Sequence, residues 1–358
     1  MPRNKKEAGS QESRVGSRPP ARERKSARGA EGKRGKGREI HPVSPLPLSP
    51  SAPARRQTSV AVVGAGRLGT ALARALAAGG YAVEALVTRR AAGARRAASR
   101  AGLRAAALSF DQLAQLPPAD ILFITTPDDA IVATAERLAA LPWAPGARGR
   151  VALHTSGALS SEALAPLRAR GFAVGSMHPL AAVTEAAAGA EDLRRAFYCV
   201  EGGARAVRVA RRVVRDLGGR SFSIDTRDKA LYHAAAVMTA GHTVALFDAA
   251  ARLLAACGLN EARAREVLLP LLASTLGNLS RQTTARALTG TFARADVETV
   301  RKHLAALRGA GDAGALAAYA LLGRLSLPLA AKNGADAAAL AEIKRALAEE
   351  VKAVNRES

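Results

Sequence analysis

Residues 59–69 read SVAVVGAGRLG, an apolar run that ends in the glycine pattern GxGxxG and leads into the apolar-faced helical pattern RLGTALARALAAG. Gly64 permits the tight turn that leaves a strand, and Gly66 lets the backbone approach a pyrophosphate closely. Gly69 allows the helix to pack against the strand, while the helix N-terminus offers unpaired N–H groups to an anion. A structural glycine-rich turn is the alternative. The predicted dinucleotide-binding residues of this turn are Gly64, Gly66, Arg67, Leu68 and Gly69.

Short apolar runs alternate with helical patterns from Ser59 to about Asp225. The later strand-like runs are YAVEALV, ADILFIT, RVALHT, FAVGSM, FYCVE and RSFSID. Parallel neighbours need a crossover of about a dozen residues, so this alternation indicates βαβ units and a parallel sheet. Together with the glycine turn, it predicts a Rossmann-type α/β domain over residues 58–225.

Beyond Asp225 the apolar residues recur at three- and four-residue spacing, as in LYHAAAVMTAGHTVALFDAAARLLAACG. This period is typical of amphipathic helices. We therefore predict an all-helical domain over residues 226–355, which contributes to the substrate site and to dimerisation.

The formal net charge of +23 raises the question of a nucleic-acid partner. Residues 1–57 account for ten of these charges, with 15 Lys and Arg against 5 Asp and Glu. This segment is rich in Pro and poor in large apolar side chains, so we expect a disordered basic tail. A polyanion-binding arm is the alternative. Aromatic residues make up 3% of the chain and offer few stacking platforms for bases, so we do not expect nucleic-acid binding.

Cysteine usage and hydropathy indicate a reducing, aqueous environment. Cys199 and Cys257 lie in apolar surroundings without a CxxC pattern, which predicts buried free thiols. Charged or histidine residues interrupt every apolar run of membrane-spanning length, and the basic N-terminus lacks an apolar signal region. His233 and His242 are nine residues apart and lack metal-ligand spacing. We expect a cytoplasmic protein without a membrane partner or a metal.

The end of the second strand indicates which dinucleotide is bound. A Rossmann protein that prefers NAD places Asp or Glu there to accept from the ribose 2′-hydroxyl. This chain reads Val87-Thr88-Arg89-Arg90 instead. Arg pairs bidentately with phosphate, so a hydroxyl followed by two guanidinium groups suits the 2′-phosphate of NADP(H). We predict NADP(H) bound by Thr88, Arg89 and Arg90; surface arginines in an Arg-rich chain are the alternative.

The loop after the ADILFIT strand lies where the ribose of the nicotinamide is expected. Thr125, Thr126 and Pro127 are therefore predicted to contact the cofactor. Pro127 with Asp128 and Asp129 also has the pattern of an ordinary helix start, so no catalytic role is assigned to them.

Two later strands end in histidine-bearing turns, His154-Thr155-Ser156-Gly157 and Met177-His178-Pro179. Ligands of doubly wound sheets bind outside the carboxyl ends of the strands. Hydride transfer to a carbonyl or imine also needs a proton donor near neutral pH. We predict His178 as proton donor or orienter, Ser156 as its hydrogen-bonding partner and His154 as a substrate contact. A structural role for these histidines is the alternative.

The first helix of the second domain carries Lys229 and His233 four residues apart, so they share a face. We predict that both close the pocket and take part in catalysis. Asn278 and Arg294 are further candidates for binding substrate, with Arg294 as a clamp for an anion or, alternatively, a surface residue. Asp296 is expected to cap the helix that follows it.

Several runs between Val62 and about Leu322 resemble a known family. They are AVVGAGRLGTAL, HTSGALS, SMHPL, DKALYHAAAV, PLLASTLGNL, ALTGTFARAD and HLAAL. They resemble the Rossmann-like proteins whose C-terminal half is the domain of unknown function 2520 (DUF2520). That family is grouped with pyrroline-5-carboxylate reductases, prephenate dehydrogenases and β-hydroxyacid dehydrogenases. The resemblance implies NAD(P)-dependent reduction, a helical domain similar to the C-terminal domain of 6-phosphogluconate dehydrogenase, and usually a dimer through that domain.

Two comparisons within this group concern the site residues. Prephenate dehydrogenases have a Ser-bearing turn and then a His-Pro turn, which matches Ser156 and His178. β-Hydroxyacid dehydrogenases use a Lys and an Asn four residues apart, which correspond to Lys229 and His233, with His in place of Asn. The departures from the DUF2520 pattern are Gly241 for Asn, Thr291 for Pro and Ala295 for Gly. The resemblance places them near the substrate pocket, which implies altered specificity or lost activity.

These expectations combine into one function. The chain is predicted to be an NADP-dependent oxidoreductase that transfers a hydride between the nicotinamide and a small anionic carbonyl or imine compound, as a homodimer through the helical domain. A non-catalytic dinucleotide-binding or sensor protein is the alternative, since a nucleotide fold does not prove chemistry.

Overall fold

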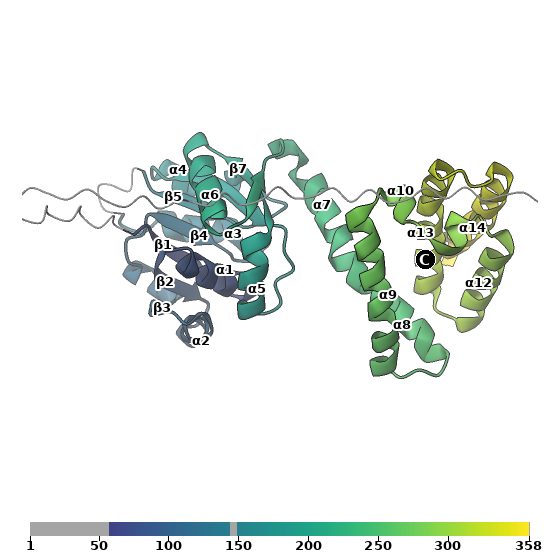
Figure 1. Cartoon of the computed structure of the whole chain (residues 1–358). Coiled ribbons are helices and arrows are strands. Elements are labelled where there is room, and N and C mark those ends of the chain that lie inside the picture. Colours follow the sequence, from purple (N-terminus) through teal and green to yellow (C-terminus); the bar gives the residue numbers. More distant parts are fainter. Residues whose placement is uncertain (1–56, 144–148, 358) are drawn as a thin grey trace, which may run out of the picture. The chain divides into compact units, whose positions relative to one another are not determined.

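The computed structural model describes residues 57–143 and 149–357, so the tail expected at residues 1–57 lies, apart from Gln57, outside the described residues. Eight strands form one sheet in the order β3-β2-β1-β4-β5-β6-β7-β8 (Figure 1). The strands are β1 (Ser59–Val63), β2 (Ala82–Thr88), β3 (Ala106–Ser109), β4 (Ile121–Ile124), β5 (Val151–His154), β6 (Ala173–Pro179), β7 (Phe197–Gly202) and β8 (Arg220–Phe222). The predicted Rossmann-type domain is confirmed.

The sheet is mostly parallel, with one antiparallel pair, β6 and β7. Tyr198 at the start of β7 lies opposite Pro179 at the end of β6. The chain therefore re-enters the sheet at the edge it has just left, after forming helix α5 (Ala186–Arg195), instead of crossing to the opposite edge. The predicted parallel sheet is therefore confirmed for most of its strands, with β7 reversed against β6.

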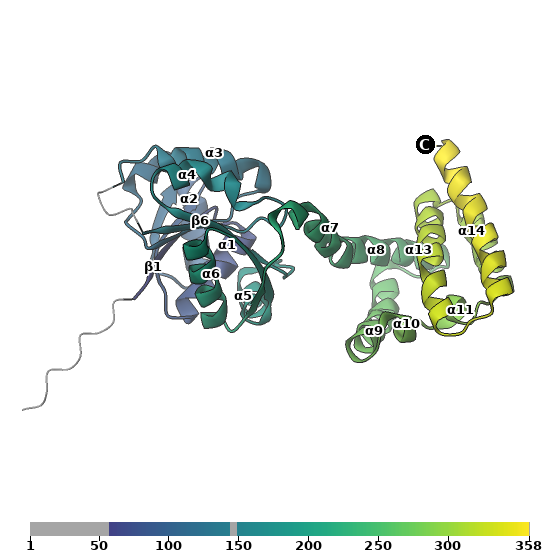
Figure 2. The same ribbon diagram turned by 90° about the horizontal axis from the view of Figure 1, so that it is seen from above.

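Helices cover both faces of the sheet (Figure 2). One face packs against α1, α2, α5 and α6, and the other against the short helix η1 with α3 and α4. The bounds are α1 (Arg67–Ala78), α2 (Ala91–Ala101), η1 (Phe110–Gln115), α3 (Asp128–Ala139), η2 (Ser161–Leu164), α4 (Ala165–Ala169) and α6 (Ala204–Asp216).

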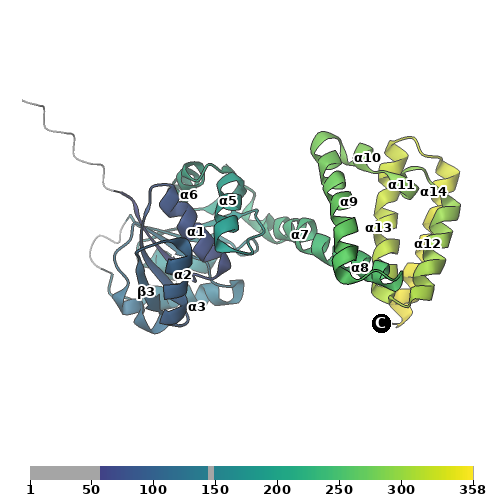
Figure 3. The same ribbon diagram turned by 60° about the horizontal axis from the view of Figure 1, so that its bottom comes forward.

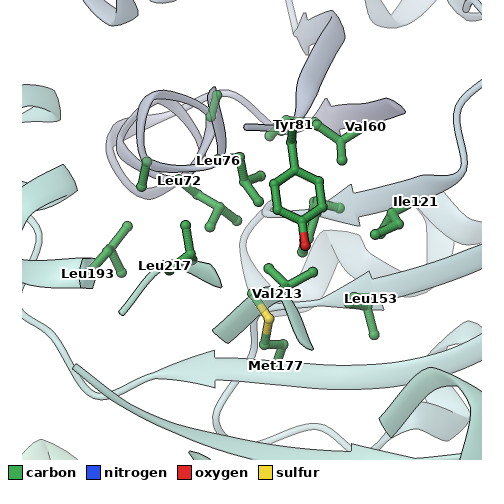
Figure 4. Close-up of a cluster of buried hydrophobic side chains, with 14 of the residues drawn as sticks. Val60, Leu72, Leu76, Tyr81, Ile121, Leu153, Met177, Leu193, Val213 and Leu217 are labelled. Carbon is green, nitrogen blue, oxygen red and sulfur yellow. The ribbon is translucent and has the colours of Figure 1, made fainter. Parts of the chain in front are cut away.

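The core beneath α1 includes one polar group, the hydroxyl of Tyr81. Leu72 and Leu76 of α1 pack with Val213 of α6 around the ring of Tyr81 (Figure 4). The Tyr81 hydroxyl donates to a carboxylate oxygen of Asp216 at 2.6 Å, so the buried phenol is satisfied.

All described elements after β8 are helical, which confirms the predicted all-α region. They are η3 (Thr226–Asp228), α7 (Lys229–Thr239), α8 (Gly241–Ala256), α9 (Glu261–Arg281), α10 (Thr284–Ala287), α11 (Gly290–Ala293), α12 (Val297–Ala310), α13 (Ala313–Lys332) and α14 (Ala337–Glu357). Helices α12, α13 and α14 lie side by side around their own apolar cluster (Figure 3). Asp296 caps α12 as expected, with its carboxylate accepting from the Thr299 N–H at 3.0 Å.

Helices α7, α8, α9 and α13 carry an exposed apolar surface. Its residues include Leu231, Met238, Val244, Leu271, Leu276 and Leu325, each more than half exposed. Two stretches, Thr226–Ala256 and Ala313–Lys332, are long and apolar enough to cross a membrane by length and composition alone. The sequence patterns did not single these out.

The two cysteines differ in exposure. Cys199 on β7 is buried, as predicted, whereas Cys257 after α8 is exposed. The expectation of two buried thiols is therefore wrong for Cys257, because α8 has no fully buried face.

Candidate functional site

The glycine turn between β1 and α1 closes tightly on neighbouring backbone. Gly64 has φ of 102°, a conformation that glycine adopts without strain, and its N–H donates to the Val87 carbonyl at 2.9 Å. A Cβ on Gly64 would lie 2.5 Å from the Thr126 nitrogen, and one on Gly69 would collide with the Thr125 hydroxyl oxygen. Gly64 and Gly69 are therefore required by close packing.

Gly66 faces open space instead. A Cβ there would meet only the Gly64 carbonyl oxygen, at 3.8 Å, and the N-terminus of α1 has no side-chain cap. Unpaired N–H groups and a bare glycine at a helix start form an anion cradle.

This cradle opens into a cavity of about 1650 Å³, called here the cofactor cleft. The hydroxyl oxygen of Thr126 is buried and has no hydrogen-bond partner in the described structure, so it is free to bond a ligand. The groups present fit a dinucleotide. The predicted cofactor residues that line the cleft are Gly64, Gly66, Arg67, Leu68, Thr88, Arg89, Arg90, Thr125, Thr126 and Pro127. Gly69 lies behind the wall, against Thr125.

The end of the cleft near β2 is basic. The Thr88 hydroxyl donates to the Arg90 carbonyl at 2.7 Å, which fixes the turn that presents Arg89 and Arg90. Arg96 and Arg100, one helical turn apart on α2, also line the cleft and were missed by the sequence reasoning. Their four-residue spacing was the signal that could have found them.

The hydrogen-bond partners of Ser156 differ from the one that the sequence predicted. Its hydroxyl donates to the Asp128 carboxylate at 2.8 Å and accepts from the N–H groups of Ala158 and Leu159. The predicted pairing of Ser156 with His178 is therefore wrong. Ser156 ties the turn after β5 to the first residue of α3, and both Ser156 and Asp128 line the cofactor cleft.

The hydrogen bonds of His154 stabilise the turn that follows it. The ring is fully buried, with Nε2 at 3.0 Å from the Ser160 carbonyl oxygen and Nδ1 accepting from the Ser156 N–H. Burial lowers the pKa of His154 to about 4, so the ring is neutral. Both nitrogens are used inside its own turn, which corrects the prediction that His154 contacts substrate.

Lys229 is also buried, with 1% of its surface exposed. Its ammonium group donates to the Ser176 hydroxyl at 2.6 Å and to the Ser156 carbonyl at 3.3 Å. Burial lowers the pKa of Lys229. Lys229 thus joins α7 to the middle of β6 and to the turn after β5, and it is not among the described side chains that line the cofactor cleft. The role that the sequence suggested for it in closing the pocket stays a prediction.

His178 and His233 do come together. Their rings are 5.5 Å apart at 81°, and Gly157 lies between them. A Cβ on Gly157 would lie 2.9 Å from Nε2 of His178 and would collide with Nδ1 of His233. The Nδ1 atom of His233 is buried and has no hydrogen-bond partner in the described structure. This pair of imidazoles is therefore able to contact a ligand.

Tyr232 bonds the other side of His178. The phenolic oxygen lies 2.6 Å from His178 Nδ1, and the two rings meet edge to face at 5.6 Å. Burial, followed by the charges of His233 and Lys229, lowers the pKa of His178 to about 4. Burial, followed by the adjacent Cys199, raises the pKa of Tyr232, so the phenol keeps its proton.

The imidazole pair opens into a second cavity of about 640 Å³, called here the imidazole cavity. Ala182 lines both this cavity and the cofactor cleft, so the two adjoin there. The lining residues are His178, Pro179, Leu180, Ala181, Ala182, Phe222, Tyr232, His233, Ala235, Ala236, Val237, Thr239, Ala240 and Gly241. Gly241, one of the departures noted in the sequence, thus lies in its wall.

The remaining candidates lie apart from both cavities. Asn278 on α9 accepts from the Arg281 guanidinium at 3.2 Å, and Arg294 is exposed beyond α11. Neither residue is among the described side chains that line the cofactor cleft or the imidazole cavity. Ala295 next to Arg294 has φ of 51° in a position where the DUF2520 pattern implies glycine.

Two family models match the chain. Residues 47–179 match a Rossmann-like domain, and residues 196–326 match a domain of unknown function, DUF2520. The second match begins one residue before β7, so it includes the last two strands of the sheet as well as α7 to α12 and part of α13. A search of curated proteins gives no match.

Solved structures share the fold at low sequence identity. A protein assigned as an NADP oxidoreductase from Bacteroides fragilis is 22% identical, with a TM-score of 0.62 over 76% of this chain and 98% of its own. A Thermotoga maritima protein is 23% identical, with a TM-score of 0.59 over 76% and 99%. A 1-pyrroline-5-carboxylate reductase from Streptococcus pyogenes is 14% identical, with a TM-score of 0.50 over 83% and 99%. The chain thus matches a Rossmann-like domain followed by a DUF2520 domain, and it shares its fold with these solved structures.

Proposed function

We propose that this protein is an NADP(H)-dependent oxidoreductase that transfers a hydride between the nicotinamide and a carbonyl or imine carbon. The observation that carries the proposal is the junction at Ala182, where the cofactor cleft meets a cavity walled by two imidazoles. Hydride transfer requires the cofactor and the reacting carbon in contact, together with a polar group near the atom that gains charge.

The charge of the cleft supports NADP(H) over NAD(H). Arg89 and Arg90 face the cleft after β2, where an NAD-binding protein places an acidic residue. Arg96 and Arg100 add positive charge to the same wall. The protein from Bacteroides fragilis that shares this fold is itself assigned as an NADP oxidoreductase.

The contact between His178 and Tyr232 and the pKa values of the two residues support one role for His178. When bound, reduced nicotinamide supplies a hydride, and the substrate oxygen or nitrogen then gains negative charge. The phenolic oxygen of Tyr232 lies 2.6 Å from Nδ1 of His178 and keeps its proton, and in the proposed arrangement it donates to Nδ1, so that the proton of the neutral ring is on Nε2. His178 therefore donates a hydrogen bond to the substrate from Nε2, as a neutral group rather than as an imidazolium.

Oxidation of NADPH in the presence of a panel of ketones, aldehydes and imines tests this function. The full-length protein should consume NADPH with at least one of them, and His178→Asn should lower kcat by about 10² while the Kd for NADPH stays within error. NADPH binding without turnover of any compound in the panel would favour a dinucleotide-binding or sensor protein.

We also propose that the protein is a homodimer in the cytoplasm. The exposed apolar surface of α7, α8, α9 and α13 is the part of the described structure that a second copy would cover. Light scattering should give the mass of a dimer, and Leu271→Glu on α9 should shift it to a monomer. Val132→Glu, at a comparably apolar exposed position on α3, is the matched control and should leave the dimer intact. A monomeric unmutated protein would contradict the proposal.

A further inference from the structure

We propose that the imidazole cavity takes an uncharged, largely apolar carbonyl or imine compound, rather than the anionic substrate that the sequence suggested. This inference rests on the proposed oxidoreductase function and narrows its substrate class. The lining of the cavity, the position of three charged side chains and the state of the two imidazoles each support it.

The side chains that line the cavity carry no formal charge while the two imidazoles are unprotonated. None of the side chains that line the cavity is Asp, Glu, Lys or Arg; besides the two histidines, Tyr232 and Thr239 are the polar ones. The other walls are built from Phe222, Leu180, Val237 and alanines. A cavity of about 640 Å³ suits a small organic molecule. Burying a carboxylate against such walls without a partner costs several kcal/mol.

Three charged side chains that lie next to the site or were expected in it do not line this cavity. Lys229 on α7, one turn before His233, is buried, and its ammonium group binds Ser176 and Ser156. Asp128 lines the cofactor cleft and accepts from Ser156. Arg294, the anion clamp expected from the sequence, is exposed and outside the described lining. No cation among the described lining residues is therefore placed to pair with an anionic substrate; the charge of Lys229 acts on His178, but its ammonium group is already bonded to Ser176 and Ser156.

The two imidazoles are suited to one uncharged polar group. The rings of His178 and His233 both line the cavity, and they pack against Gly157 on the side that faces away from it. His178 stays neutral at physiological pH, because its pKa is about 4. In the proposed complex a carbonyl oxygen or imine nitrogen accepts from the His178 N–H, and the His233 ring lies beside it as an uncharged wall. The rest of the ligand is left to contact apolar walls.

A matched pair of ligands tests the inference through binding alone. Calorimetry on the full-length protein saturated with NADP⁺, which cannot donate a hydride, compares methyl benzoylformate with benzoylformate. Only the charge differs substantially between these two ketones. The ester should bind at least tenfold more tightly than the acid, a difference of about 1.4 kcal/mol.

A carboxylate that binds as tightly as the ester would overturn the inference, and so would a failure of both to bind. Failure of the proposed function has a different result. In that case the protein does not bind NADPH, or it binds NADPH but does not oxidise it with any compound.

Variants in the cavity wall provide a second measurement. Ala236→Arg places a cation in the wall and should reduce or reverse the preference for the ester. Ala236→Leu adds bulk without charge, and Ala234→Arg adds the same charge on α7 outside the lining. Both controls should keep the preference. If Ala236→Arg does not fold, Val237→Lys at the more exposed rim replaces it. An unchanged preference in the folded cationic variant would contradict the inference.

Discussion

The Nδ1 atom of His178 lies 2.6 Å from the phenolic oxygen of Tyr232, and this contact joins the end of strand β6 to helix α7. The two residues are 54 positions apart in the sequence. The contact fixes the orientation of the imidazole, and with Tyr232 as the donor, as proposed, it places the proton of the ring on Nε2. Tyr232 is therefore a positioning residue for His178.

Removal of the Tyr232 hydroxyl should weaken catalysis through His178. Tyr232→Phe keeps the ring against His178 and Phe222 but leaves Nδ1 without its donor. We expect kcat to fall by about tenfold or more, with KM and the Kd for NADPH little changed. Nitrogen NMR should show a mixture of His178 tautomers, a change that a purely structural tyrosine would not produce.

The pair His303 and Tyr319 provides the control for this variant. Its Nδ1 to hydroxyl distance is 2.8 Å and its rings meet edge to face at 5.7 Å, but neither residue is among the described lining of the two cavities. Tyr319→Phe should leave kcat unchanged. An equal loss of kcat in both variants would refute a specific role for Tyr232.

Gly157 keeps the space between the two imidazoles open. Gly157→Ala would force His178 and His233 apart, because its Cβ would lie 2.9 Å from His178 Nε2. Turnover should fall by about 10², since misplacement of a catalytic group by about 1 Å has effects of this size. The Kd for NADPH should not change. Gly309→Ala on α12, where a Cβ meets nothing within 4 Å, is the control and should keep full turnover.

Acidification should destabilise the protein before its carboxylates titrate. Burial lowers the pKa values of His154 and His178 from 6.5 to about 4, so the unfolded chain binds protons at these residues in a pH range where the folded protein does not. The stability that the neutral rings of His154 and His178 contribute is fully present above pH 6.5, and it is lost as the pH falls from 6.5 to about 4.

Thermal unfolding across this pH range checks the prediction. The Tm should fall steadily between pH 6.5 and pH 4, and the slope should be smaller in His178→Asn. A Tm that stays level down to pH 4 would show that both rings protonate without cost in the folded state.

The glycine turn and the strand and helix periods were predictable because each depends on local residues. Gly64, Gly66 and Gly69 have the backbone roles that the pattern GxGxxG requires. The direction of β7 was not predictable, because a short apolar run carries no mark of parallel or antiparallel pairing. Helix α5 was missed because AAAGAEDLRR has a single large apolar residue, Leu193; small residues such as Gly189 let it pack closely on α1.

The site was predicted in part, and the errors have a common cause. The spacing of Lys229 and His233 correctly placed both on α7, but only the packed structure shows that Lys229 is buried while His233 lines a cavity. His154 was assigned to the substrate because it ends a strand, yet its ring bonds its own turn. Which way a polar side chain points at a strand end depends on distant partners such as Ser176 and Tyr232.

The measurement that tests the account most directly is the affinity of the full-length protein for NADPH and NADH, determined side by side. NADPH should bind at least tenfold more tightly, or about 1.4 kcal/mol, and the double variant Arg89→Ala, Arg90→Ala should lose most of that difference. Arg194→Ala with Arg195→Ala, an exposed pair on α5 outside the described lining of the cleft, removes the same charge and should preserve it. Equal affinities for the two cofactors in the unmutated protein, or no binding of either, would contradict the account.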